Sequence, residues 1–136
     1  MYLIYSPEGS DEPKRWKYVP RKIMSAEREM LERRTSRNWS EFTKDVVAGS
    51  SLCRRALLFM YLKREHPTVK YEDVDFAWDE LKLEYSKGEL IKLRDTVAED
   101  ATGEQGAAML AQFDRQIAEA FEDPEEEGKA SLPVVE

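Results

Sequence analysis

Leu52-Cys-Arg-Arg-Ala-Leu-Leu-Phe-Met-Tyr-Leu62 is the most apolar segment of the chain, and it decides the fold. Its apolar residues run all round a helix, which is typical of a helix buried at the centre of a domain. Ser50 or Ser51 can cap its start, and His66-Pro67 ends it. The sequence therefore predicts a fold built around one buried helix.

Two helices are predicted before this central one. Ser25 is the expected N-cap of a helix over residues 26–34. Ser40 is the expected cap of the next helix, which Gly49 closes because glycine readily adopts a left-handed backbone conformation. The polar residues 35–38 separate the two helices.

Two more helices are predicted toward the C-terminus. Ser86 and Glu89 have the spacing of a capping box, and an apolar face continues after them. An amphipathic stripe then indicates a final helix over about residues 104–122. Both stretches favour surface helices with one apolar side.

Short strands are expected at the N-terminus. Residues 2–5 are aromatic and β-branched, residues 6–13 have the composition of a loop, and residues 16–19 alternate apolar and polar up to Pro20. A two-strand ribbon is marginal in water, so it must lie on the helices.

The segment of residues 69–85 supports two interpretations. Its apolar residues fall mostly in steps of two, which favours extended structure. Trp78, Leu81 and Tyr85 also fit a helical stripe, and the sequence leaves both readings open.

The resulting fold class is a mainly α, compact helical domain with a short N-terminal β-ribbon and a disordered acidic C-terminal tail. We expect a single domain over residues 1–122, in which residues 1–20 hold the strands and their loop. Residues 123–136 are rich in acidic residues and contain two prolines, which is typical of a disordered tail.

Charge is distributed unevenly along the 136 residues, whose formal net charge is −7. Residues 1–69 hold 14 basic and 9 acidic residues, whereas residues 70–136 hold 7 basic and 19 acidic residues. The two halves can attract each other within one molecule or from one copy to the next. Solvated charge on helix faces is the simpler interpretation of the same asymmetry.

The chain has no apolar run long enough for a membrane span and no basic-then-apolar start typical of a signal peptide. Its single cysteine, Cys53, cannot form an internal disulfide, which suits a reducing compartment. We therefore expect a cytoplasmic protein that does not contact a membrane.

Residue types that carry chemistry are sparse, and we expect no catalytic site, no cofactor and no metal. The only histidine, His66, and the only cysteine, Cys53, lie on one predicted helix about 20 Å apart, too far to form a nucleophilic pair. The carboxylates of residues 72–80 lack the glycine and spacing of a calcium loop. Basic and aromatic residues alternate over residues 14–18, but the overall acidity argues against nucleic acid as the main partner.

Three stretches carry a resemblance to a known family. They are Tyr18-Val-Pro-Arg-Lys-Ile-Met-Ser-Ala-Glu-Arg-Glu29, Trp39-Ser-Glu-Phe42, and the stretch from Arg55 to Phe76 that ends in Tyr71-Glu-Asp-Val-Asp-Phe76. In pattern and order the chain resembles the tail assembly chaperones of long-tailed phages, especially phages of actinobacteria. The resemblance covers roughly residues 16–85.

The resemblance implies a function. Such chaperones coat the aggregation-prone tape measure protein in the host cytoplasm before the tail tube forms, and they are usually absent from the finished virion. We also expect this chain to associate with itself in multiple copies. Many are also made in a longer, frameshifted form, and Gly128-Lys129 is compatible with a slippery site. Two other classes stay open: a virion structural protein such as a head–tail connector or tail-terminator component, and an acidic inhibitor of a host DNA-binding protein.

Two groups of apolar residues are candidates for partner binding. Phe76, Trp78, Leu81 and Leu83 lie among acidic residues, which a buried element seldom carries. Phe113, Ile117 and Phe121 lie on a late helix that the main core does not obviously need. Each group is either ordinary core or a surface for helical segments of the tape measure protein.

Overall fold

The computed structural model describes residues 1–123 and has a mainly helical fold with a short three-stranded sheet, in agreement with the predicted fold class. Its contacts divide the chain into two compact units. Residues 2–83 form the first unit, and Met1 with residues 84–123 forms the second. The sequence predicts one domain over residues 1–122, whereas the contacts separate the last helices from the rest.

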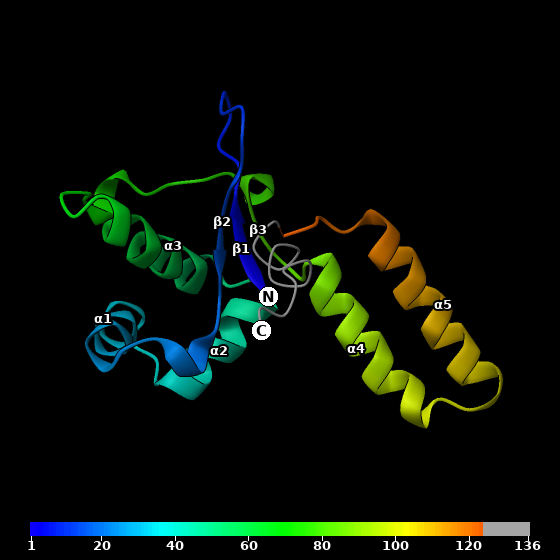
Figure 1. The fold of residues 1–136 in the computed structure, drawn as a ribbon. Coiled ribbons are helices and arrows are strands. Elements are labelled where there is room, and N and C mark those ends of the chain that lie inside the picture. Colours follow the sequence, from blue (N-terminus) through cyan, green and yellow to red (C-terminus); the bar gives the residue numbers. More distant parts are fainter. Residues whose placement is uncertain (124–136) are drawn as a thin grey trace, which may run out of the picture. The chain divides into compact units, whose positions relative to one another are not determined.

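The first unit contains a sheet with the strand order β2-β1-β3 (Figure 1). Strand β1 (Tyr2–Tyr5) pairs antiparallel with β2 (Lys14–Lys17), and Leu3 lies opposite Trp16. Strand β3 (Leu81–Glu84) joins the other edge of β1. The third strand supports a ribbon that would be marginal alone.

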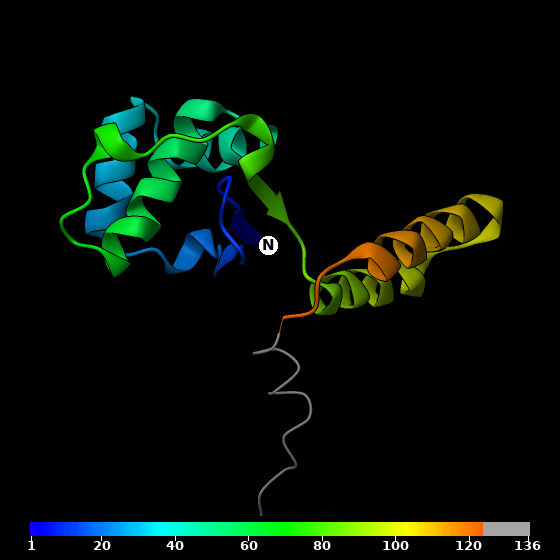
Figure 2. The same cartoon turned by 90° about the horizontal axis from the view of Figure 1, so that it is seen from above.

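Three α-helices follow the ribbon and a 3-10 turn at Pro20–Lys22. They are α1 (Ser25–Thr35), α2 (Trp39–Ala48) and α3 (Ser51–Glu65). The predicted central helix is confirmed: α1 and α2 both pack on α3 (Figure 2), whose middle is buried throughout. The core also takes side chains from the sheet and both neighbouring helices, including Leu3, Leu31, Phe42, Val46, Cys53, Leu57, Leu58 and Met60.

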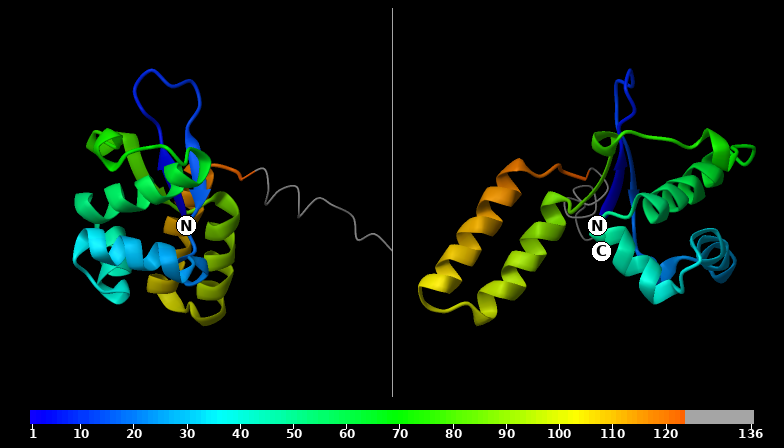
Figure 3. Two further views of the ribbon diagram at one scale, coloured as in Figure 1. Left: turned by 90° about the vertical axis from the view of Figure 1, so that its left-hand side faces the viewer. Right: turned by 180° about the vertical axis from the view of Figure 1, so that it is seen from behind.

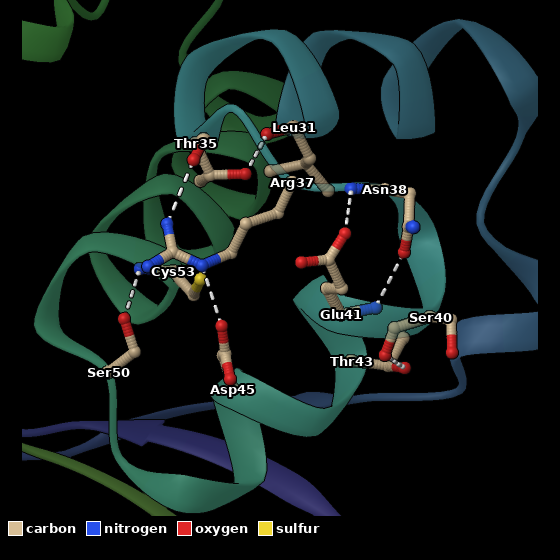
Figure 4. A network of polar contacts seen from close by, with 10 residues as sticks. All are labelled: Leu31, Thr35, Arg37, Asn38, Ser40, Glu41, Thr43, Asp45, Ser50 and Cys53. Carbon is tan, nitrogen blue, oxygen red and sulfur yellow. Dashed lines mark hydrogen bonds and ion pairs between the residues drawn. The ribbon is translucent and has the colours of Figure 1, made fainter.

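Polar contacts fix the corner between α1 and α2 (Figure 4). Arg37 donates from Nε to Asp45 Oδ2 at 2.6 Å and from Nη1 to the carbonyl of Thr35 at 2.8 Å. Asn38 Oδ1 accepts from the amide of Glu41 at 2.8 Å, and the Glu41 carboxylate accepts from the Asn38 amide. This capping box satisfies amides that the first turn of α2 leaves unpaired.

The expected caps at Ser25 and Ser40 are wrong, and the others are right. Ser25 is the first residue of α1, and no side chain caps that helix. Asn38 precedes Ser40 and has Glu41 at capping-box spacing, so it takes the cap position instead. Gly49 closes α2 with a φ of 96°, and Ser50 caps α3 through the amide of Cys53.

Arg55 of α3 determines the geometry of the ambiguous segment. Its Nε donates to the carbonyl of Val74 at 2.6 Å, and its Nη2 donates to the carbonyl of Tyr71 at 3.1 Å. The Tyr71 ring also lies 4.2 Å from the Arg34 guanidinium and 4.3 Å from that of Arg55. The segment forms 3-10 turns at Tyr71–Asp73 and Trp78–Glu80 and then continues into β3. The extended interpretation therefore describes the structure better than the helical one.

The second unit is a helical hairpin of α4 (Lys87–Asp100) and α5 (Gly103–Glu119), which pack on each other (Figure 3). The predicted capping box is confirmed, because Ser86 Oγ accepts from the Glu89 amide at 3.2 Å and Glu89 Oε1 accepts from the Ser86 amide at 3.0 Å. The Lys87 amide donates to the carbonyl of Phe121 at 2.8 Å, which ties the two ends of the hairpin together.

The end of the chain differs from the prediction in two respects. Helix α5 ends at Glu119, three residues before the expected end, and Asp123 is buried. The rest of the expected tail, residues 124–136, lies outside the described residues. Within residues 1–123, no helix combines the length and the apolar character needed to cross a membrane.

Candidate partner-binding surfaces

The first candidate group separates into core and surface residues. Leu81 is only 2% exposed and belongs to the core of the first unit, so it offers no accessible contact. Phe76 and Leu83 are half-buried and pack against the same core. Trp78 alone is largely exposed, at 68%.

Trp78 lies over the turn between α2 and α3. A Cβ on Gly49 would be 3.2 Å from the indole Cη2, so the ring lies directly against this glycine. The Arg54 guanidinium lies 5.8 Å from the ring centroid and also donates to the carbonyl of Val46 at 2.8 Å. Val47 and Leu52, which flank this turn in sequence, are also exposed. The indole is thus held in place while most of it remains open to a partner.

Glu80 holds the segment that carries Trp78. Its carboxylate accepts from the Ala77 amide through Oε1 and from the Glu8 amide through Oε2, both at 2.6 Å. These backbone hydrogen bonds, that of Ala77 first, lower the pKa of Glu80 because they favour the ionised form. One carboxylate therefore joins the Trp78 turn to the loop between β1 and β2.

The second candidate group lies on or just after α5, which packs on α4. Phe113, Ile117 and Phe121 are all half-buried. Gly106, Leu110, Phe113, Ile117 and Ala120 follow each other in steps of four and three, the spacing of one helix face. We call this row the hairpin seam, because its members are buried or half-buried, which indicates that the row faces α4.

Sequence reasoning missed the exposed apolar residues beside the seam. Met109 of α5 is 47% exposed, and Ile91 and Leu93 of α4 are 43% and 37% exposed. Met109, Gln112 and Gln116 repeat at steps of three and four along α5 without a charge, in an otherwise acidic region. That uncharged row is the sequence signal that could have indicated this surface.

Each unit also has an open hollow. In the second unit a hollow of about 330 Å³ lies at the base of the hairpin, lined by Glu84, Tyr85, Leu90, Gln116, Glu119 and Ala120. In the first unit a hollow of about 300 Å³ lies between α1 and α3, lined by Ala26, Glu27, Met30, Met60, Lys63 and Arg64. Arg64 and Glu27, which both line this first-unit hollow, form a bidentate ion pair with distances of 2.6 and 2.9 Å.

The residue types that could take part in catalysis or metal binding are not among the residues of these surfaces. Cys53 is fully buried near the start of α3, and His66 is exposed just after its end. In the described part of the chain, no three His, Cys, Asp or Glu side chains gather where they could hold a metal ion. Trp16, within the basic stretch of residues 14–18, stacks on Tyr61 with 5.4 Å between ring centroids.

Comparison with known proteins does not place the chain in a family. No protein-family model matches it, and neither curated proteins nor solved structures contain a significant match.

Proposed function

We propose that the chain is a non-catalytic chaperone of phage tail assembly that binds the tape measure protein in the host cytoplasm. The observation that carries this proposal is the uncovered apolar edge of the α4–α5 hairpin. Met109 and Leu93 are held on regular helices, yet a large part of each side chain remains open. Exposed apolar side chains on ordered elements are typical of surfaces that bind another protein.

Trp78 supports the proposal from the first unit. Tryptophan is enriched among residues that dominate binding energy, and this one is positioned by Gly49 and Glu80 while it remains exposed. A chaperone that covers a long chain benefits from several such contact points, each of them weak.

The resemblance over residues 16–85 provides the identity of the partner. Within it, Tyr71 and Val74 of the acidic-aromatic stretch are packing residues that Arg55 fixes on α3. The acidic excess of the chain would keep a coated filament soluble through mutual repulsion. We further propose that many copies act on one partner and leave before the virion is complete.

Two measurements test this function. Peptide mass spectrometry should find the chain abundant in infected-cell lysate and missing from purified particles. Co-expression should raise the soluble fraction of the tape measure protein, and Trp78→Ser should lower that gain while Lys70→Ser, an exposed change in the same segment, should not. Stoichiometric presence in particles would contradict the proposal and favour a structural protein of the virion.

A further inference from the structure

The two long edges of the α4–α5 hairpin are chemically different. Ile91 and Leu93 are two residues apart and therefore point about 200° apart around α4, to opposite edges. The Ile91 edge is closed by an ion pair between the helices, in which Arg94 Nε donates to Asp114 Oδ1 at 2.6 Å and Nη2 donates to Oδ2 at 3.3 Å. Met109 lies five residues before Asp114, about 140° away around α5, and so belongs to the other edge.

On that other edge, the hollow at the base of the hairpin continues into a row of apolar and uncharged polar residues. The hollow at the base of the hairpin includes Tyr85, Leu90 and Gln116. Leu93 follows Leu90 by three residues on α4, and Gln112 and Met109 precede Gln116 by four and seven residues on α5, so all lie on the same side. We call Tyr85, Leu90, Leu93, Met109, Gln112 and Gln116 the Met109 groove.

The six residues of the Met109 groove are uncharged, and acidic residues lie at both of its ends. Glu84 and Glu119 line the hollow at one end, and Asp100 lies two turns beyond Leu93 at the other. Residues 84–123 together hold ten acidic and four basic residues. An apolar groove with acidic ends complements a segment that has an apolar stripe between lysines or arginines.

We infer that the Met109 groove binds one helix of the partner, an amphipathic segment rich in lysine or arginine, which completes a three-helix bundle with α4 and α5. The inference rests on the proposed function for the partner's identity and adds the surface and the chemistry of the bound segment. A helix fits because the groove between two packed helices runs parallel to them and offers apolar contacts along its length. A second copy of the hairpin fits less well, because its acidic excess would face the same acidic ends.

Two labelled synthetic peptides test the inference on the full chain by fluorescence anisotropy. Both place leucine at the a and d positions of a helix, and the remaining positions are lysine in one and glutamate in the other. We expect the lysine peptide to bind at least about tenfold more tightly than the glutamate peptide, and added salt to reduce the difference.

Matched variants distinguish peptide binding in the groove from general electrostatic attraction to an acidic protein. Met109→Lys and Leu93→Lys should each weaken binding of the lysine peptide by about tenfold. Ile91→Lys makes the same charge change at a similarly exposed position on the opposite edge, and it should leave binding within about twofold. Far-UV circular dichroism confirms that each variant keeps its helices.

Several outcomes would overturn the inference. Equal binding of both peptides, or an equal loss with Ile91→Lys, would show that the groove does not select the ligand. Sedimentation of the wild-type chain as a dimer that Met109→Lys makes monomeric would assign the groove to a second copy. Binding as expected, together with the chain present in finished particles, would keep the groove and overturn only the proposed function.

Discussion

The two units of this chain differ in how completely they bury their own apolar side chains. In residues 2–83, α1 and α2 pack on α3, and side chains of the sheet join them. The result is a core of fully buried side chains, among them Leu31, Phe42 and Leu57. Among the apolar residues of 84–123, only Leu90 is buried. Two packed helices have one shared face, so a hairpin leaves its flanks open where a layered unit covers them.

The positions of the tryptophans allow the two units to be followed separately. Trp16, Trp39 and Trp78 are the only tryptophans, and all three lie in the first unit. Tryptophan fluorescence therefore reports unfolding of the first unit, whereas far-UV circular dichroism also detects α4 and α5. If the units are energetically independent, the circular dichroism should begin to change at a lower urea concentration than the fluorescence.

The largest effect is expected for Leu57→Ala. Leu57 is completely buried on α3, and its truncation removes apolar contacts and leaves a cavity, so the free energy of unfolding of the first unit should fall by about 2–5 kcal/mol. Urea unfolding followed by tryptophan fluorescence measures this loss. Leu93→Ala, the same truncation at a partly exposed site of the hairpin, should leave that fluorescence transition in place, and a shift would show that the units are coupled.

A smaller loss is expected when Arg55 is truncated. Arg55→Ala removes two hydrogen bonds to the backbone of residues 71–74 and one guanidinium from the Tyr71 ring, so the first unit should lose about 2 kcal/mol. Arg55→Lys should recover only part of it, because an ammonium cannot span both carbonyls. Arg33→Ala, at an exposed position of α1, serves as the control and should stay within about 0.5 kcal/mol of wild type.

Gly106→Ala should act on the hairpin alone. A Cβ at Gly106 would lie 2.9 Å from the backbone carbon of Ala101, so α5 would have to move away from the turn that joins it to α4. The strain should outweigh the better helix propensity of alanine and cost the hairpin about 1 kcal/mol. The early circular dichroism transition should move to lower urea. Movement of the fluorescence transition as well would contradict the separation of the units.

The parts of the fold that the sequence predicted correctly depend on local signals. Ser50, Gly49 and the Ser86–Glu89 box mark helix ends through hydrogen bonds or backbone preferences within a few residues. The central position of α3 follows from its own composition. The third strand could not be predicted from local signals, because residues 81–84 form a strand by joining β1, which lies at the other end of the unit's sequence.

The candidate surfaces show the same difference between features set by local sequence and features set by long-range contacts. Sequence reasoning selected Trp78, which is exposed, together with Leu81, which is buried, because acidic neighbours surround both. It could not place Leu93 and Met109 on one surface, since they lie on the same edge of the hairpin only because α4 and α5 pack on each other. It also gave no reason to divide the chain near Glu84, because the division depends on long-range contacts.

The smallest stability effects concern two buried tyrosines of the first unit. The Tyr61 hydroxyl donates to the carbonyl of Lys17 at 3.2 Å, whereas the Tyr18 hydroxyl has no hydrogen-bond partner within the described residues. Tyr61→Phe should therefore lower the free energy of unfolding by about 1 kcal/mol, and Tyr18→Phe should leave it unchanged or raise it, because an unpartnered buried hydroxyl is unfavourable. An equal loss in both variants would mean that Tyr18 has a partner in solution.

The same tyrosines should make the first unit sensitive to high pH. Burial raises the pKa of Tyr61 to about 12 and also raises the pKa of Tyr18, because the folded protein disfavours the phenolate. A pKa raised above its unfolded value of about 10 gives stability that is complete below pH 10 and is lost as the pH rises through the folded pKa. Tryptophan fluorescence should therefore record alkaline unfolding that starts above about pH 10, and the double variant with phenylalanine at both positions should shift it to higher pH. An unchanged alkaline midpoint in the double variant would show that other groups control it.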